Sequence, residues 1–208
     1  YYPLEFLTTA FNINKDKEEK TSGLTAYAKR AGIEIKAPKF RFSKGKYFCD
    51  KETNCIYKGI GSLKFFNSHL ADELYGLRNN KYNDFIDVLI AVRNNTSVNS
   101  RQLDILIKID YFSEFGEINQ LLKYNKLFNS IYGKKQFKKD KLSEIGIELR
   151  DIVPFAKKET DKMFSNVDTY AMLKNILTII TFPKTSVAEK IGWQREHLGY
   201  IDVIDKAY

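Results

Sequence analysis

The 208-residue sequence predicts a mainly α-helical fold that contains one small β excursion. Along most of the chain, apolar residues recur at intervals of three and four, which is the period of a helix with one buried face. The exception lies between residues 33 and 57, where short apolar runs are separated by polar turns, as is typical of strands. The 15 Phe and 13 Tyr residues are expected to fill much of the core.

The helices follow from apolar spacing and from the residues that begin and end each segment. Leu4, Leu7 and Phe11 share one helix face behind Pro3, a residue that suits the first helical turn. Gly32 is a typical residue just beyond a helix end. The expected helices cover residues 4–12, 23–31, 68–75, 82–93, 100–111, 117–131 and 168–181.

The β excursion is expected to contain three short extended segments. Residues 33–35 alternate in polarity and end before Pro38, while 47–49 and 55–57 flank a polar turn. Cys49 and Cys55 lie on either side of that turn, either as two idle thiols or as a bridge across a hairpin. A metal site is not expected, because zinc needs about four ligands and the two His residues lie far away in the sequence.

The net charge of +8 favours a polyanionic partner or a role in solubility. Basic residues cluster in two stretches, each of which is either a binding patch or a solvated loop. The first cluster holds Lys36, Lys39, Arg41, Lys44 and Lys46, and the second holds Lys134, Lys135, Lys138, Lys139 and Lys141. No apolar run approaches the roughly 20 residues that cross a bilayer, so no membrane partner is expected.

A series of short motifs occurs in one order along the chain. They are Tyr2-Pro3-Leu4-Glu5-Phe6, Arg30 to Ile35 followed by Pro38, Ile56 to Lys64, Asp84-Phe85, Asp110 to Gly116, and Arg195-Glu196-His197-Leu198-Gly199-Tyr200. This order resembles the region that follows the palm in the alpha subunit of bacterial DNA polymerase III, the C-family replicase.

The resemblance implies a division of the chain into three parts. Residues 1–132 correspond to the late fingers and a helix-hairpin-helix region that binds DNA. Residues 133–143 form a basic linker, and 144–208 form a helical C-terminal segment that leads toward an OB domain missing from this sequence. The chain lacks an initiator Met and is expected to be a fragment or a processed product of a cytoplasmic, nucleoid-associated protein.

The resemblance places the DNA contact in the hairpin of that region. Such hairpins normally carry a Gly-hydrophobic-Gly turn whose N–H groups approach a phosphate, followed by a helix N-terminus. Here Phe65-Phe66-Asn67 replaces that turn, so the hairpin either binds the DNA backbone or is purely structural. Asn67 tolerates a left-handed backbone and is expected to replace the second glycine. The candidate DNA-binding residues are Lys58, Lys64, Phe65, Phe66, Asn67 and Ser68, of which Ser68 is also a candidate helix cap.

The resemblance implies the DNA partner of the family for this chain, but not its catalytic activity. Nucleotidyl transfer uses palm aspartates that hold magnesium, and the residues that correspond to them lie outside this sequence, so this chain alone should be inactive and needs no cofactor. The expected partner is duplex DNA, bound without sequence specificity. A protein-interaction module is the alternative, with a sliding clamp or another replisome subunit as partner. The candidate clamp-binding anchors are Met163 and Phe164.

Overall fold

The computed structural model describes residues 2–199 and confirms the mainly α-helical fold with small β-sheets. The described residues divide into two compact units. Unit 1 comprises residues 2–81, 91–118 and 185–199, and unit 2 comprises 82–90 and 119–184. The expected boundary lay instead in the lysine-rich stretch 133–143.

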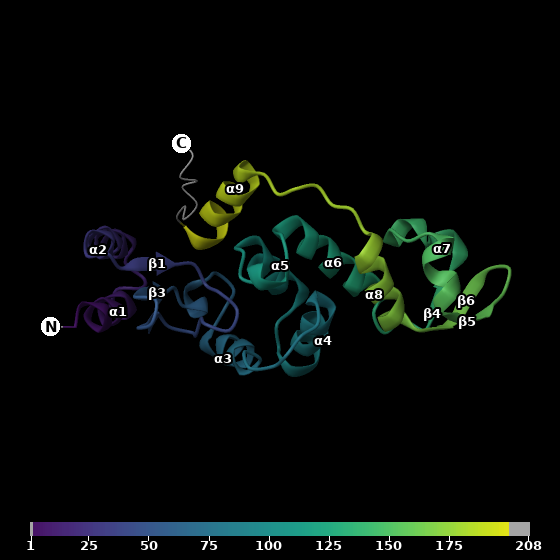
Figure 1. Ribbon diagram of the computed structural model, residues 1–208, viewed down its shortest axis with the longest axis horizontal. Coiled ribbons are helices and arrows are strands. Elements are labelled where there is room, and N and C mark those ends of the chain that lie inside the picture. The colour runs from purple at the N-terminus through teal and green to yellow at the C-terminus, as the bar shows by residue number, and fades with distance from the viewer. Residues whose placement is uncertain (1, 200–208) are drawn as a thin grey trace. The chain divides into compact units, whose positions relative to one another are not determined.

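Unit 1 holds the hairpin region and most of the helices (Figure 1). Its helices are α1 (Pro3–Ile13), α2 (Glu18–Arg30), α3 (Ser68–Gly76), α5 (Ser100–Lys108), α9 (Val187–Leu198) and the second half of α4 (Phe85–Asn95). Two short 3-10 helices, η1 (Ile60–Ser62) and η2 (Ser113–Phe115), also belong to it. Helix α2 begins earlier than expected, because Glu18 and Glu19 suit the positive end of a helix dipole.

The expected β excursion is a three-stranded sheet in unit 1. Its strands are β1 (Glu34–Lys36), β2 (Phe48–Asp50) and β3 (Cys55–Tyr57), in the order β1-β3-β2. Strand β3 runs parallel to β1 and antiparallel to β2. All three residues of β3 are buried because it is the central strand. The two Cys residues are free thiols.

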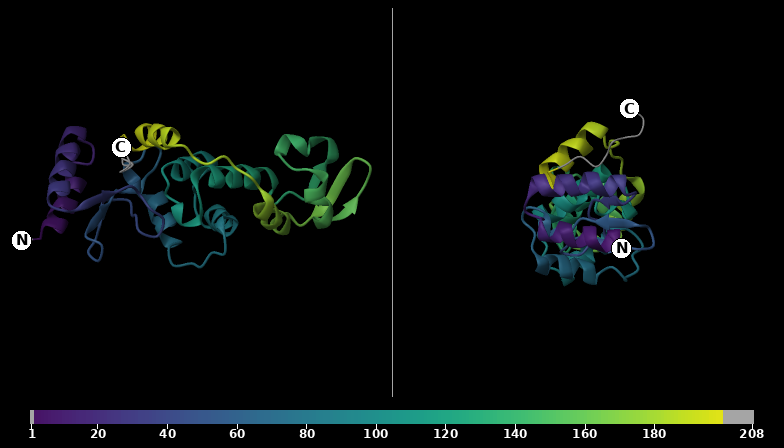
Figure 2. Two further views of the ribbon diagram at one scale, coloured as in Figure 1. Left: turned by 45° about the horizontal axis from the view of Figure 1, so that its top comes forward. Right: turned by 90° about the vertical axis from the view of Figure 1, so that its left-hand side faces the viewer.

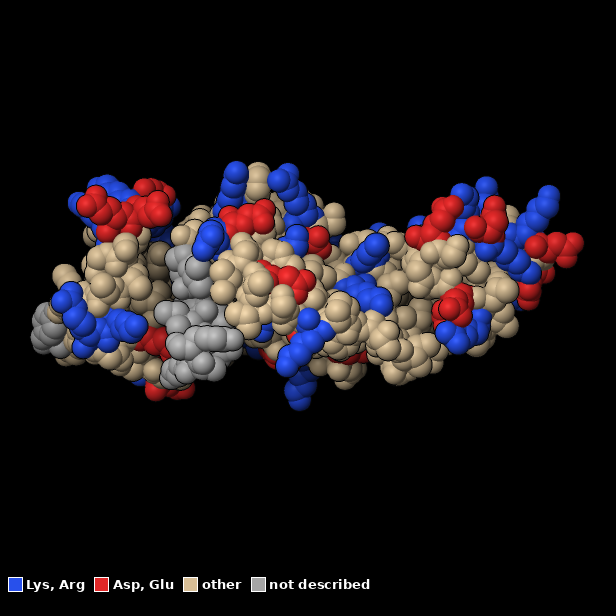
Figure 3. Space-filling view, turned by 90° about the horizontal axis from the view of Figure 1, so that it is seen from above, with Lys and Arg blue, Asp and Glu red and all other residues tan. Residues whose placement is uncertain are grey.

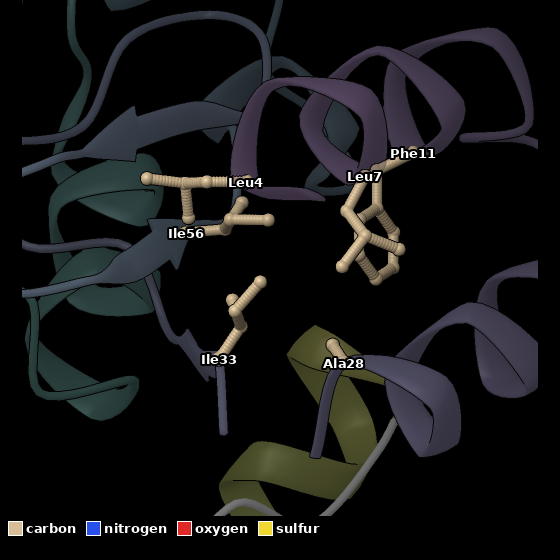
Figure 4. Packing of buried hydrophobic residues seen from close by; sticks show 6 residues of the cluster. All are labelled: Leu4, Leu7, Phe11, Ala28, Ile33 and Ile56. Atoms are coloured by element: carbon tan, nitrogen blue, oxygen red, sulfur yellow. The ribbon is translucent and has the colours of Figure 1, made fainter. Parts of the chain in front are cut away.

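Helices α1 and α2 pack against this sheet and close the first core (Figures 1 and 2). Figure 4 shows its six labelled side chains converging from α1, α2, the residue before β1 and strand β3: Leu4, Leu7, Phe11, Ala28, Ile33 and Ile56. The Phe11 ring stacks on Tyr47 with 4.8 Å between centroids, and burial raises the pKa of Tyr47 to about 12. The side chain of Asn12 bonds both main-chain groups of Tyr47, at 2.8 and 3.1 Å. The start of the chain thereby fixes the loop that precedes β2.

Unit 2 contains a second three-stranded sheet that sequence reasoning missed. Its helices are α6 (Ile118–Ile131, from residue 119 on), α7 (Leu149–Ile152), α8 (Thr169–Ile179) and the first half of α4. Its strands β4 (Gln136–Lys138), β5 (Ala156–Glu159) and β6 (Met163–Val167) are antiparallel in the order β4-β6-β5. The short 3-10 helices are η3 (Lys139–Lys141), η4 (Ser143–Ile145) and η5 (Val153–Phe155).

The stretch 133–143, expected to be a linker, therefore consists of a strand and 3-10 turns. Phe137 in β4 lies opposite Phe164 in β6, and both rings are buried. This pairing buries one face of a segment that otherwise consists mostly of charged residues. Because lysines surround Phe137, the hydrophobic pattern of this segment does not indicate a strand.

An ion-pair network joins α8 to the start of α4 within unit 2. The Lys174 ammonium lies 2.5 Å from Asp84 and 2.7 Å from Asp87. Burial opposes ionisation of Asp87, but hydrogen bonds from Lys174, the Asn83 N–H and Tyr170 outweigh it and lower its pKa. These carboxylates have a structural role in holding the two helices together.

Candidate nucleic-acid interface

The hairpin begins where two glycines meet another segment of backbone. Residues 59–62 pass so close to residues 44–46 that the N–H of Ile60 bonds the Lys44 carbonyl and that of Gly61 bonds the Gly45 carbonyl, at 2.9 and 3.0 Å. A Cβ atom on Gly59 or Gly61 would lie 2.5 or 2.7 Å from the Gly45 oxygen. Only glycine fits at either position, so this close contact fixes η1 against residues 44–46.

The hairpin tip is a four-residue turn closed by a hydrogen bond of 3.1 Å from the Phe66 N–H to the Leu63 carbonyl. Phe65, the third residue of this turn, has a φ of +73°. Glycine ordinarily takes such a position, because a side chain there costs roughly 1–2 kcal/mol. The turn thus keeps the shape that a glycine would give it, although a phenylalanine occupies it.

Asn67 was expected to take the left-handed backbone, and the structure corrects this. Its φ of −136° and ψ of 174° are extended, and its side chain accepts a hydrogen bond of 2.9 Å from the Leu70 N–H. Asn67 is therefore the N-cap of α3, while Ser68 is the first helical residue. The first turn of α3 presents N–H groups that have no acceptor within the helix. Among residues 2–199, the N–H groups of Lys64 and Phe65 also donate no hydrogen bond.

Helix α5 holds the hairpin tip through one side chain. Asn99 and Gln102 form a reciprocal capping box at the start of α5. The Nε2 atom of Gln102 also donates to the Phe65 carbonyl at 2.8 Å. The hairpin and the N-terminus of α5 are consequently one rigid corner.

The Phe65 ring lies on the surface of this corner with cations around it. It is 48% exposed, so it does not belong to the core. The Arg101 guanidinium lies 4.3 Å from the ring centroid, and the Lys64 ammonium lies 5.2 Å from it. Within the described part of the chain, neither cation forms an ion pair. Phe66 is half-buried.

A cavity of about 240 Å³ opens beside the ring, and its walls come from the hairpin, α5 and α9. The walls are formed by Lys64, Phe65, Arg101, Asp104, Ile105, Lys108, Glu196 and His197. His197 is largely buried, and its Nε2 atom has no hydrogen-bond partner among the described residues. Burial lowers the pKa of His197, the nearby Glu196 opposes this shift, and Lys108 adds to it.

Lys58, a candidate for DNA binding, is placed inside the protein. Only 9% of it is exposed, and its ammonium donates a hydrogen bond of 2.9 Å to the Leu198 carbonyl. This carbonyl lies at the C-terminal end of α9, where a cation is favourable. Lys58 therefore anchors the helix that forms one wall of the cavity.

Much of the first basic cluster is also engaged in structure. Lys39 bonds the carbonyl and carboxylate of Asp110, at 2.6 and 3.2 Å, and Arg41 bonds Glu114 at 2.7 Å. The Lys44 ammonium lies 4.2 Å from the centre of the Phe48 ring. The contacts of Lys39 and Arg41 fix the loop after β1 to the residues that follow α5. The face in Figure 3 likewise mixes Lys and Arg with acidic side chains.

The second basic cluster and the expected clamp anchors lie in unit 2. Lys134, Lys135 and Lys138 are exposed, while Lys139 pairs with Glu159 at 2.5 Å. Phe164 is completely buried in the central strand β6, and Met163 beside it is half-buried. An anchor must be free to enter a partner's pocket, and a buried ring in a paired strand is not.

The comparison with known families identifies the motif that contains this corner. Residues 32–121 match the family model of a helix-hairpin-helix motif. Such motifs commonly bind DNA, which supports a nucleic-acid partner for this chain. No curated protein matches the sequence. The helix-hairpin-helix motif spans the sheet, the hairpin, α3 and α5, so the rigid corner around Phe65 lies inside it.

The helix-hairpin-helix motif contains functional candidates that sequence reasoning missed. Arg101, Gln102 and Lys108 follow the hairpin by more than 30 residues, and only the fold brings them to it. The Asn99–Gln102 spacing was a sequence signal for a capping box, but not for the bond to Phe65. Tyr200, the last residue of the final motif, lies outside the described residues.

Neither a metal site nor a membrane span occurs among residues 2–199. No group of three His, Cys, Asp or Glu residues in this part of the chain is placed to hold a metal ion. Within the same residues, none of the helices has the length and apolar character needed to span a bilayer.

Proposed function

We propose that the helix-hairpin-helix motif of unit 1 binds duplex DNA through its phosphates, without reading sequence. The observation that carries this proposal is the tight turn at residues 63–66, with the N-terminus of α3 after it. Beside the turn lie two cations that form no ion pair with any of residues 2–199. Backbone N–H groups and a helix N-terminus together attract a phosphate. Lys64 and Arg101 add charge where that phosphate would lie.

The rigidity of the corner supports this role. The glycine contact with residues 44–46, the Asn67 cap and the Gln102 bond fix the turn from three sides. A preorganised turn does not lose conformational freedom when it binds, so more of the contact energy appears as affinity. Phosphate contacts of this kind position DNA and carry no sequence information.

We also propose that the chain is the DNA-holding region of a replicative polymerase related to the C-family alpha subunit. The motif order along residues 2–116 and 195–199 supports this proposal. In such a polymerase the region would hold duplex DNA behind an active site whose carboxylates lie outside this sequence. The sliding clamp and other replisome subunits remain partners that the resemblance predicts.

A protein-docking module remains the second candidate, and one observation favours it. Phe65 fills the position at which a DNA-binding hairpin usually has glycine, and its ring is exposed. Exposed aromatic residues are common anchors in protein interfaces. Binding to duplex DNA decides between the two candidates.

The test is a fluorescence anisotropy titration of the full chain against a blunt duplex of about 20 base pairs, between about 50 and 200 mM salt. We expect affinity to fall steeply with salt, because each phosphate contact releases counterions. Lys64→Gln and Arg101→Gln should each weaken binding and reduce the slope of the log–log salt plot by about 1. Lys20→Gln, which removes an exposed charge from α2, is the matched control. Binding that ignores salt, or equal losses in all three variants, would contradict a phosphate contact at the hairpin.

A further inference from the structure

We infer that the cavity beside Phe65 holds one unpaired nucleobase, stacked on the Phe65 ring, of the DNA that the hairpin binds. This inference rests on the proposed function and adds a ligand to it. The hairpin would then prefer a duplex that contains an unpaired nucleotide over a continuous one. Three features of the corner support it: the Phe65 backbone, the cations over its ring and the polar groups of the cavity.

The Phe65 backbone indicates that the ring is not there for stability. A φ of +73° is unfavourable for any residue with a side chain, and glycine would avoid the cost. The ring is 48% exposed, so about half of its surface is open to a ligand. Strained residues that persist in a rigid surrounding cluster at binding sites. An exposed ring on a rigid turn is a stacking platform for a base, since every base has a flat apolar face.

The cations beside the ring suit the rest of a nucleotide. Arg101 and Lys64 lie over the ring at 4.3 and 5.2 Å, and neither has an ion-pair partner within residues 2–199. An aromatic ring flanked by cations is the usual arrangement for binding single-stranded nucleic acid. The ring takes the base while the cations take the phosphates on either side of it. Because both cations are exposed, they can move off the ring as the base enters.

The cavity is polar in a way that fits a base better than a phosphate. Asp104 and Glu196 line it together with the cations, and a carboxylate repels a phosphate. A carboxylate accepts hydrogen bonds from the amino group of a base such as cytosine. His197 also lines the cavity, with its Nε2 atom buried and without a partner among the described residues. At about 240 Å³ the cavity is smaller than pockets for drug-sized ligands, which span roughly 300–1,000 Å³. One base fits this size, whereas a strand does not.

The experiment compares two labelled DNAs of the same length, a blunt duplex and the same duplex with one extra unpaired cytosine. We expect the full chain to bind the second at least about 5-fold more tightly, since stacking on one aromatic ring contributes about 5-fold to 100-fold in affinity. Phe65→Tyr keeps the ring and should keep this ratio. Phe65→Gly should bring the ratio close to 1, while its thermal midpoint does not fall because the strain is relieved. Phe6→Ala, which removes an exposed ring from α1, is the control and should keep the ratio.

The outcomes separate this inference from the proposed function. Equal affinity of the unchanged chain for the two DNAs, or a ratio that survives in Phe65→Gly, would overturn the base-binding cavity alone. Salt-dependent binding of the blunt duplex would still support the phosphate contact. Failure to bind either DNA would overturn both proposals and favour the protein-docking candidate.

Discussion

The side chain of Gln102 donates a hydrogen bond of 2.8 Å to the main-chain carbonyl of Phe65, so helix α5 fixes the tip of the hairpin. The same side chain accepts from the Asn99 N–H at 2.9 Å. Gln102 therefore takes part in the N-terminal cap of α5 and also holds the strained turn of the hairpin.

Two substitutions at Gln102 separate its two roles. Gln102→Glu keeps the acceptor for Asn99 but places a carboxylate against the Phe65 carbonyl, so the hairpin should loosen while α5 stays capped. Gln102→Ala loses both bonds and should lower the free energy of unfolding by about 1–2 kcal/mol. Duplex affinity should fall in both variants, and urea unfolding with anisotropy measures both effects. Unchanged DNA affinity in Gln102→Glu would show that the turn does not need this bond.

Gly61→Ala should destabilise the protein by about 1–3 kcal/mol, because the new methyl group would overlap the Gly45 carbonyl. Gly23 is the matched control. It lies inside α2, where an added methyl group would meet nothing within 4 Å, so Gly23→Ala should stabilise by about 0.5–1 kcal/mol. Chemical denaturation of both variants tests the pair. Similar effects at both positions would mean that the close backbone approach at Gly61 does not constrain the hairpin.

Lys58→Met should loosen the last turn of α9. The change removes a cation from the C-terminal carbonyl of Leu198, an interaction that contributes about 1 kcal/mol at a helix end. Hydrogen exchange of the α9 amides should therefore speed up by about 5-fold. The opposite pattern, weaker DNA binding with α9 protection unchanged, would restore Lys58 to the role that the sequence predicts.

His197 should make stability depend on pH. Burial lowers its pKa in the folded protein below the value of 6.5, so the unfolded chain binds the proton more readily. The stability that neutral His197 contributes is thus present above about pH 6.5 and is lost as pH falls below it. Relative to His197→Gln, the unchanged protein should lose stability between about pH 7.5 and pH 5.5. A difference between the two proteins that stays constant with pH would contradict a buried neutral imidazole.

Sequence patterns were sufficient to predict a helix where a single apolar face packs against a single core. Leu4, Leu7 and Phe11 were expected on one helix face, and all three are buried in the first core. Strands β4, β5 and β6 were all missed. Strand β5 consists mostly of Lys and Glu, so only its tertiary pairing with β6 makes it a strand. Residue preference also predicted a left-handed backbone for Asn67, whereas Phe65 adopts it.

The site could be predicted only in its local part. Asn67 was expected to take the left-handed backbone because its residue type tolerates it, but capping α3 requires an extended Asn67, and Phe65 takes the turn instead. Arg101 and Gln102 reach the hairpin only through the packing of α5, which no local pattern encodes. The sequence motif predicted where the hairpin lies. The cations and the cavity beside it were seen only in the folded structure.

The most direct test is an amide NMR titration of the isotope-labelled chain with a blunt DNA duplex. If the hairpin binds phosphate through its main chain, the largest shifts on adding DNA should occur at the amides of residues 64–69 and of Arg101, and they should vanish at high salt. Shifts confined to the lysines of residues 134–139, with the hairpin amides unmoved, would contradict a phosphate site at this turn.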